Sequence, residues 1–422
     1  MNKIQTLENG FRIITSEMPY MESVSIGVWI GVGGRYETPK LSGISHFIEH
    51  MLFKGTKTRN ASQLKQAIEG IGGQFNGFTG EDVTCYLVKV PSKYMDLGVD
   101  ILSDMIINPA ISTHELEKEK NVICEEIKMY KDQPSSYVQE LLAEIMWEKH
   151  PLGFPLAGSE KTVLSMDQKM LLDFKEKYYC SGNIAFAACG KIKMKDFQRA
   201  VKFSCDKIKV GKQQSSEIYK NTQKNKRYTT FFKNTEQTHV EFGFKSVGRK
   251  SKDRYAVNLL NIILGGNMSS RLFEELREKQ GLCYDVSSSA KKYDEIGVFS
   301  VHAGVDNNKV KQTIDTVIEQ LEILKTSKVP DAELKRAKEF FKGQFLLMLE
   351  STGSRMLWLG EKILTEGNIP KIKEVLSQID KISACDLQRI SKQIFVSKNM
   401  NFAAIGPERI LKKIDLNSSL NC

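Results

Sequence analysis

The sequence predicts an α+β fold of two homologous domains, each a mostly antiparallel sheet with helices packed on one face. Three observations lead to this prediction. Segments with the two-residue alternation of strands are interleaved with segments of helical periodicity, which is typical of layered α+β domains. Short stretches of the first half recur in the second half. The chain has 422 residues, 41% of them hydrophobic and 27% charged, which is an ordinary globular mixture with room for two domains.

The internal repeat is clearest in one apolar strand. Residues 183–190 (NIAFAACG) recur as residues 399–406 (NMNFAAIG), 216 positions later. Residues 24–28 likewise resemble residues 240–244, and residues 113–117 resemble residues 331–335. One chance match between short apolar strands is common, but several at nearly one displacement favour a duplicated domain. We therefore predict an N-terminal domain at 1–206, a Lys-rich linker at 207–227 and a C-terminal domain at 228–422.

The elements of the first half follow from local patterns. An Asn-Gly turn precedes an expected strand at 10–15, and residues 23–31 alternate as a strand. Further elements are expected as helices at 42–53, 62–71 and 94–107 and as strands at 74–79 and 84–90. A long helix is expected from about residue 112 to about residue 131, because Ser112 and Glu115 have the spacing of a capping box.

Charge and cysteine content narrow the class of protein. The net charge of +10 permits contact with nucleic acid, but a solvated basic surface is the commoner cause, and no aromatic-interleaved basic motif accompanies it. The eight cysteines, from Cys85 to Cys422, form no CxxC pair and indicate reduced, partly buried thiols. The N-terminus lacks the apolar region of a secretory signal, and no run of 18 apolar residues occurs. We expect a cytoplasmic protein without a membrane span or a nucleic-acid partner.

The strongest chemical signal is the segment His46-Phe47-Ile48-Glu49-His50. Positions i, i+3 and i+4 share one face of a helix, so both imidazoles and the carboxylate can meet one object. The apolar residues around them indicate a buried helix, where these polar groups need a partner. Zinc is such a partner, since neutral imidazoles ligate it and the carboxylate can accept a proton from water. The plainer alternative is a pair of satisfied surface histidines.

A catalytic zinc usually has three protein ligands, so a third ligand is expected from another element. The helix expected at 112–131 offers Glu115, Glu117, Glu119, Glu125 and Glu126. Seven residues separate Glu119 from Glu126, which places them on one face, whereas Glu125 is rotated away from it. Spacing alone does not choose the ligand, and a solvated acidic face is the alternative for any single glutamate.

Together, residues 46–56 (HFIEHMLFKGT) and 118–136 (KEKNVICEEIKMYKDQPSS) resemble the M16 (pitrilysin) family of zinc metallopeptidases, the inverzincin type. The resemblance covers essentially the whole chain. In length, the chain resembles the short-chain branch of the family, which includes mitochondrial processing peptidase beta-type subunits and bacterial relatives. It implies a LuxS/MPP-like metallohydrolase fold. It also implies that His46, His50 and Glu126 ligate one Zn²⁺ per chain, that Glu49 is the catalytic base and that Glu119 supports the site.

The second half has no histidine pair at the matching position, and Gln344 and Ala337 stand where Glu126 and Glu119 would match. Residues 270–284 instead resemble the Arg/Tyr segment of the family. This resemblance implies that Arg277 holds a substrate carbonyl and that Tyr284 stabilises the oxyanion. The alternative is a basic helix end followed by a buried aromatic residue.

Residues 73–79 resemble the edge strand of the family, which binds extended substrate by strand addition. The resemblance implies that Asn76, Gly77 and Phe78 contact substrate, although the family more often has Ala at the position of Gly77. An ordinary glycine-tolerant strand is the alternative.

The function that the resemblance implies is zinc-dependent endopeptidase activity (EC 3.4.24.-) on peptides or on extended, unfolded polypeptide. It also implies that two chains close into a chamber, with Arg277 and Tyr284 of one chain facing the zinc of the other. A homodimer would suffice, and a heterodimer with an inactive homologue is the alternative. A non-catalytic scaffold, like the core subunits of this family in respiratory complexes, is the rival function.

Overall fold

Two β-sheets organise the chain in this computed structural model, which describes residues 2–205 and 207–414. The six-stranded sheet has the order β1-β2-β6-β3-β5-β4, and the five-stranded sheet has the order β7-β11-β8-β10-β9. The strands are β1 (Asn2–Thr6), β2 (Arg12–Glu17), β3 (Ser23–Ile30), β4 (Gln74–Thr79), β5 (Thr84–Pro91), β6 (Ile184–Gly190), β7 (Arg227–Phe232), β8 (Gln237–Val247), β9 (Cys283–Lys292), β10 (Ile296–Asp306) and β11 (Asn401–Gly406).

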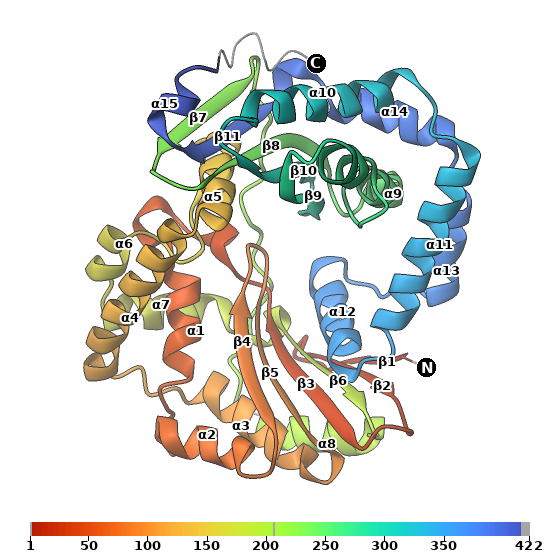
Figure 1. The fold of residues 1–422 in the computed structure, drawn as a ribbon. Coiled ribbons are helices and arrows are strands. Elements are labelled where there is room, and N and C mark those ends of the chain that lie inside the picture. Colours follow the sequence, from red (N-terminus) through yellow and green to blue (C-terminus); the bar gives the residue numbers. More distant parts are fainter. Residues whose placement is uncertain (1, 206, 415–422) are drawn as a thin grey trace. The chain divides into compact units, whose positions relative to one another are not determined.

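Helices connect and cover the strands (Figure 1). Those of the first half are α1 (Ile44–Leu52), α2 (Ala61–Glu69), α3 (Met95–Ile107), α4 (Thr113–Asp132), α5 (Pro134–Met146), α6 (Glu160–Ser165), α7 (Gln168–Tyr178) and α8 (Met194–Ser204). Those of the second half are α9 (Arg254–Leu264), α10 (Val310–Thr326), α11 (Asp331–Met348), α12 (Thr352–Thr365), α13 (Ile372–Asp380), α14 (Ala384–Ile394) and α15 (Glu408–Leu411). The helices and strands predicted up to residue 132 agree with these bounds to within about two residues.

The two sheets share one topology over five strands. Strand β6 lies between β2 and β3, parallel to β2 and antiparallel to β3. Strand β11 lies in the same way between β7 and β8. Strands β5 and β4 extend the first sheet, and β10 and β9 extend the second, all antiparallel. The recurring sequences form β6 and β11, so the repeat in sequence is also a repeat in structure, and the predicted α+β fold is confirmed.

The chain divides into two units, and each unit contains one helix from the other half of the sequence. The first unit comprises Met1–Met129, Phe154–Glu217 and Leu346–Ile369, and the second comprises Tyr130–Gly153, Ile218–Phe345 and Pro370–Cys422. Helix α12 therefore belongs to the first unit and α5 to the second. One change of unit falls between Glu217 and Ile218, in a stretch without helix or strand. The domain boundaries expected from the sequence stay a prediction.

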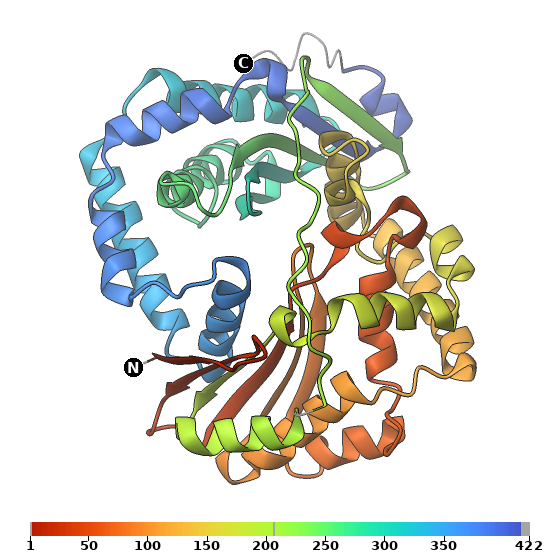
Figure 2. The same ribbon diagram turned by 180° about the vertical axis from the view of Figure 1, so that it is seen from behind.

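In the first unit, helices cover one face of the six-stranded sheet with a large apolar core, and α12 covers the other face (Figures 1 and 2). Buried residues of α12 contact Trp29 and other side chains of that face. Gly27 on β3 permits this close approach, because a Cβ there would overlap Met356 of α12. The guanidinium of Arg12 donates hydrogen bonds to the carbonyls of Ile363, 3.0 Å away, and Gly182, 3.1 Å away. These bonds fix the last turn of α12 on the sheet.

In the second unit, α5 takes the corresponding place on the five-stranded sheet. Its residues Val138, Leu141 and Leu142 pack against Ala403 and Ile405 of β11. The other face of this sheet carries the second large apolar core, which includes residues of α9, α10 and α14. Each sheet therefore has one broad core and one smaller helix contact on its opposite face.

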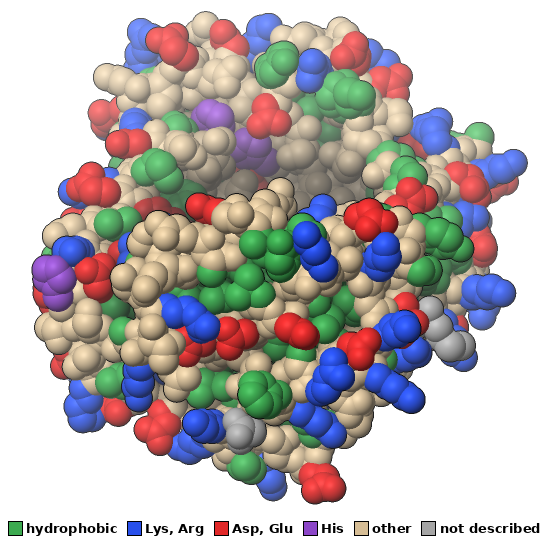
Figure 3. Space-filling view, turned by 90° about the horizontal axis from the view of Figure 1, so that it is seen from below, with side chains coloured by type: hydrophobic (Ala, Val, Ile, Leu, Met, Phe, Trp, Pro, Cys, Tyr) green, Lys and Arg blue, Asp and Glu red, His purple; other side chains and the backbone are tan. Residues whose placement is uncertain are grey.

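The described cysteines are free thiols, and the surface carries charges of both signs. Seven cysteines lie in the described part of the chain, where they are free thiols, and Cys422 lies outside the described residues. Within residues 2–205 and 207–414, no helix combines the length and the apolar character that a bilayer crossing requires. On the face shown in Figure 3, side chains of Lys and Arg alternate with those of Asp and Glu. This mixture is typical of a solvated protein surface.

Candidate metal centre

Helix α1 carries the histidine pair, and a buried carboxylate fixes its start. Its apolar side chains, which include Phe47 and Met51, lie in the core. At the N-terminus, the carboxylate of Glu37 accepts hydrogen bonds from the backbone N–H groups of Gly43, 2.7 Å away, and Ser45, 2.8 Å away. These are orphan donors of the first helical turn, so Glu37 caps the helix. Burial raises the pKa of Glu37 to about 7.

The structure brings His46, His50 and Glu126 together. The Oε2 atom of Glu126 lies 3.7 Å from Nε2 of His46 and 3.5 Å from Nε2 of His50. The ligand atoms of the three residues all lie within 4.8 Å of one another. Of the five glutamates that the sequence left as candidates, Glu126 is the one in this cluster. Glu125 is 73% exposed and pairs with Lys128 at 2.8 Å, as its rotation on the helix predicts.

Glu119 lies behind His50, on the same face of α4 as Glu126. Its Oε1 atom is 3.1 Å from Nδ1 of His50, and its Oε2 atom pairs with Lys54. Burial acts to raise the pKa of Glu119, but the hydrogen bonds from His50 and Lys54 outweigh it and hold the pKa below the usual value. Glu119 is therefore an ionised acceptor for the ring N–H of His50. This orients Nε2 of His50 toward Glu126, the usual arrangement behind a metal-ligating histidine.

His46 is held in its neutral form. Burial lowers the pKa of His46 to about 4, with a further contribution from the neighbouring His50. A neutral imidazole has a free lone pair for a metal ion at neutral pH. Its Nδ1 atom is buried and has no hydrogen-bond partner among the residues that the structure describes.

These residues fit a zinc ion. Two imidazole nitrogens and one carboxylate oxygen are the ligand types of a catalytic zinc, which keeps a fourth position for water or substrate. The separations of 3.5 and 3.7 Å between nitrogen and oxygen leave space for an ion about 2.0–2.2 Å from each atom. The geometry of these three residues thus agrees with the donor set that the sequence predicts.

Glu49 faces the edge strand β4, which holds its carboxylate. The hydroxyl of Thr79 donates a hydrogen bond of 2.7 Å to Oε2 of Glu49. Burial raises the pKa of Glu49, and the Thr79 hydroxyl partly opposes this. A Cβ at Gly77 would lie 3.1 Å from Oε1 of Glu49 and 2.9 Å from the ring of Phe53. Glycine at this position therefore leaves Oε1 uncrowded.

Sequence reasoning did not identify Glu37, Lys54 or Thr79 as parts of this centre. Lys54 stands four residues after His50, a spacing that could have placed it near the helix face. Glu37 stands only six residues before Gly43, so a carboxylate just ahead of the expected helix is a local signal that could have identified it, whereas the contact of Thr79 requires tertiary structure.

Strand β4 forms the edge of the six-stranded sheet and pairs only with β5 among the described strands. Asn76 and Phe78 are exposed, and the ring of Phe78 packs edge-on against Trp29. The backbone N–H of Gly77 donates to Oδ1 of Asn76 at 2.8 Å. An added strand that takes this N–H would have to displace the Asn76 side chain.

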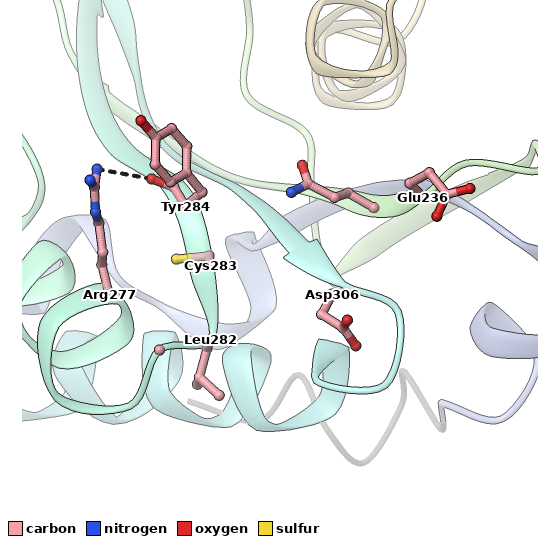
Figure 4. Close-up of a pocket in the computed structure, with 8 residues that line it drawn as sticks. Glu236, Arg277, Leu282, Cys283, Tyr284 and Asp306 are labelled. Atoms are coloured by element: carbon pink, nitrogen blue, oxygen red, sulfur yellow. Dashed lines mark hydrogen bonds between the residues drawn. The ribbon is translucent and has the colours of Figure 1, made fainter.

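Arg277 and Tyr284 lie in the second unit, on η6 (Phe273–Lys279) and β9. The Arg277 guanidinium lies 4.7 Å from the ring centre of Phe273 and 4.5 Å from that of Tyr284, and it donates to the Tyr284 carbonyl at 3.1 Å (Figure 4). Tyr284 is 75% exposed, so it is not the buried aromatic residue of the alternative interpretation. Both residues line a pocket of about 460 Å³ together with Glu236 and Asp306.

Family models match both halves of the chain. Residues 12–160 match the family model described as insulinase (peptidase family M16), and residues 165–341 match the peptidase M16 inactive domain. The chain is 36% identical over 410 residues to the uncharacterized zinc protease YmxG of Bacillus subtilis, with 96% of this chain and 98% of that protein covered.

Two solved structures have the same fold. One is the crystal structure of a protease from Helicobacter pylori, with a TM-score of 0.91, 22% identity, and 96% and 99% of the two chains covered. The other is a peptidase M16 inactive domain from Pseudomonas fluorescens, with a TM-score of 0.89, 18% identity, and 96% and 98% covered. At these identities, the likeness concerns the fold alone.

Proposed function

Because the chain belongs to peptidase family M16, we propose that it is a zinc-dependent endopeptidase acting on peptides or on extended, unfolded polypeptide. The observation that carries the proposal is the convergence of His46, His50 and Glu126 beside the carboxylate of Glu49 on the same helix. A peptide bond needs an activated water and a stabilised oxyanion, and these residue types can provide both.

His46, His50 and Glu126 would hold the ion. A zinc ion bound there would act as a Lewis acid, which lowers the pKa of a ligated water from 15.7 toward about 7. Glu49 would accept the proton of the attacking water and pass it to the leaving amine. Since Thr79 occupies Oε2 of Glu49, Oε1 is the oxygen that remains to take the proton. The raised pKa of Glu49 suits this exchange, because a base is most effective when its pKa approaches the working pH.

Two further sets of residues would hold the substrate. The free edge of β4 offers backbone groups at Asn76, Gly77 and Phe78 to an extended peptide. Arg277, fixed between two aromatic rings, would donate to a substrate carbonyl, and the hydroxyl of Tyr284 would donate to the oxyanion. Backbone pairing makes few demands on sequence, so the proposal favours flexible peptides over folded proteins.

A peptide library tests the proposed activity. The purified protein is incubated with the library, with and without a chelator, and cut sites are read by mass spectrometry. We expect internal cleavage that the chelator abolishes and added Zn²⁺ restores. Cleavage that continues at the same rate in excess chelator would contradict the zinc mechanism.

We also propose that two copies of the chain act together, with Arg277 and Tyr284 of one copy serving the zinc of the other. The chain carries both sets of residues, so a homodimer needs no further protein. Mixing inactive His50→Ala and Arg277→Ala chains tests this arrangement, because a hybrid dimer would contain one site with all its residues. We expect mixing to restore part of the activity, whereas sites completed within one chain would stay inactive. If the chain instead needs an inactive homologue as its partner, the purified chain alone will be inactive.

The second candidate function is a non-catalytic scaffold, and one comparison favours it, since residues 165–341 match the family model of a peptidase M16 inactive domain. The presence of all three ligand residues and of Glu49 supports the peptidase instead. The zinc that is lost on replacing His50 by alanine separates the two, because a scaffold has no need of an ion at this centre. A cytoplasmic location belongs to the same proposal, and the free thiols of the described cysteines are in keeping with it.

A further inference from the structure

A second cluster of histidine and carboxylate side chains lies on the five-stranded sheet, in the second unit. His239 and Glu241 are two apart on β8, and Glu241 pairs with His302 of β10. Gly304 of β10 pairs with His239 on one side and with Asp285 of β9 on the other. Residues directly opposite one another in antiparallel strands share a face, so all four polar side chains project from the same face.

His302 is the centre of this cluster. Its Nδ1 atom is 2.9 Å from Oε2 of Glu241, and the two side chains are only 8% and 4% exposed. Its Nε2 atom is buried and has no hydrogen-bond partner in the described part of the chain. Oδ2 of Asp285 lies 3.6 Å from that atom, and the Asp285 side chain is 61% exposed. A ring nitrogen with no partner therefore faces a carboxylate that solvent can reach.

The same order of groups occurs at the first metal centre. There, Nδ1 of His50 is 3.1 Å from buried Glu119, and Nε2 is 3.5 Å from Glu126. In both places a buried carboxylate holds one nitrogen of the imidazole, and the other nitrogen faces a second carboxylate. The separation of 3.6 Å at His302 lies between the two separations of the first centre. An ion about 2.0–2.2 Å from each atom fits such a gap.

His239 can supply a further ligand. Its ring stacks on His302 with 5.6 Å between the ring centres and 27° between the planes. The ligand atoms of His239, His302 and Asp285 do not all lie within 4.8 Å of one another, so coordination by His239 requires a rotation of its ring. Gly304 leaves space beside this ring, because a Cβ there would lie 3.1 Å from Cε1 of His239. Its Nδ1 atom also has no hydrogen-bond partner among the described residues.

We propose that His302 and Asp285, with His239 as a third ligand, bind a divalent transition-metal ion such as Zn²⁺, and that Glu241 orients His302. Imidazole and carboxylate ligands suit Zn²⁺ and its neighbours in the first transition series. The site does not depend on peptidase activity. It adds a second metal ion to the one per chain that the sequence predicts.

Metal titration tests the site without any assay of activity. Metal-stripped His50→Ala protein, which lacks the first centre, is titrated with Zn²⁺ by calorimetry and with Co²⁺ by visible absorption. We expect one equivalent to bind and Co²⁺ to give the bands of a nitrogen-ligated site. Adding Asp285→Asn or His302→Gln should weaken binding at least about 10-fold, and Glu241→Gln about 10- to 100-fold. Asp285→Asn is the safer variant, since this exposed side chain should not affect folding.

Asp306→Asn in the same His50→Ala background is the matched control. Asp306 is an exposed carboxylate two residues after Gly304 on the same strand as His302, and its Oδ1 atom accepts a hydrogen bond from the backbone N–H of Asn308, 2.8 Å away. We expect this control to bind the metal as tightly as its parent. Absence of stoichiometric binding in the His50→Ala protein would overturn the proposal. Equal effects of Asp285→Asn and Asp306→Asn would also overturn it, because the residual ion would then lie elsewhere. Failure of the peptide-library assay would leave this result unaffected.

Discussion

Replacing Glu119 by glutamine should weaken zinc binding at the first centre by about 10- to 100-fold, because Glu119 orients His50 without touching the ion. In the native chain, Oε1 of Glu119 lies 3.1 Å from Nδ1 of His50, and the side chain is 3% exposed. Glutamine has nearly the same shape and can still accept a hydrogen bond from His50. The substitution therefore removes mainly the negative charge that strengthens His50 as a ligand.

The size of this effect follows from the burial of the pair. A 10- to 100-fold loss corresponds to about 1.4–2.7 kcal/mol of binding free energy. The net worth of a hydrogen bond to a charged group is about 1.5–3 kcal/mol, so the two ranges agree. Lys54, the other partner of Glu119, is partly exposed and can be hydrated after the substitution. We therefore expect little change in the melting temperature of the metal-free protein.

The assay is a competition titration of the metal-stripped variant against a chromophoric chelator. Glu125→Gln is the matched control, since Glu125 is on the same helix, is 73% exposed and pairs only with Lys128 among its described ion pairs. Its zinc affinity should equal that of the native protein. If Glu119→Gln bound zinc within about twofold of the native protein, the supporting role of Glu119 would be refuted.

Three further predictions concern the base, the start of α1 and the packing of α12. Thr79→Val should lower kcat about 10- to 100-fold with zinc content unchanged, because Oε2 of Glu49 loses its hydrogen-bond donor. Thr79→Ser keeps the hydroxyl and should keep most of the activity. A native kcat for Thr79→Val would exclude a role of Thr79 in positioning Glu49. The pKa of Glu37 rises from 4.5 to about 7 in the folded protein, so its stabilising contribution is complete below pH 4.5 and is lost as the pH rises to about 7. Glu37→Gln should remove this pH-dependent loss of stability, which is about 3 kcal/mol at most. The same dependence of melting temperature on pH in the native protein and in Glu37→Gln would contradict the prediction. Gly360→Ala should destabilise the protein by about 1–3 kcal/mol, because the new Cβ would overlap Trp29. In the control Gly343→Ala the new Cβ meets nothing within 4 Å, so this substitution should stabilise its helix by about 0.5–1 kcal/mol. Equal effects of the two substitutions on thermal unfolding would show that α12 is packed differently.

The sequence predicted most of the local structure around the first centre. Helices α1 and α4 and strand β4 have clear periodicity, and Ser112 accepts the hydrogen bond from the Glu115 N–H that its spacing predicts. Periodicity also placed Glu119 and Glu126 on one face of the helix, among the five glutamates that were candidates for the third ligand. It could not separate them, because the choice depends on how α4 packs against α1.

Long-range features were not predictable in the same way. The contact of Thr79 with Glu49 joins residues 30 positions apart in sequence, so no local pattern reports it, whereas Glu37 lies within eight residues of the N–H groups that it accepts from. The apolar faces of α5 and α12 show that each helix is buried but do not show against which sheet. The cluster at His302 needs the register of three strands, which neither composition nor spacing supplies.

The most direct test of the central claim compares zinc content and peptide cleavage in Glu49→Gln and His50→Ala proteins. We expect Glu49→Gln to retain as much zinc as the native protein and to lose turnover, because it removes the base and keeps the ligands. His50→Ala should lose both turnover and the zinc of the first centre. Native cleavage by Glu49→Gln, or native zinc content in His50→Ala, would contradict a hydrolytic zinc centre built on this helix.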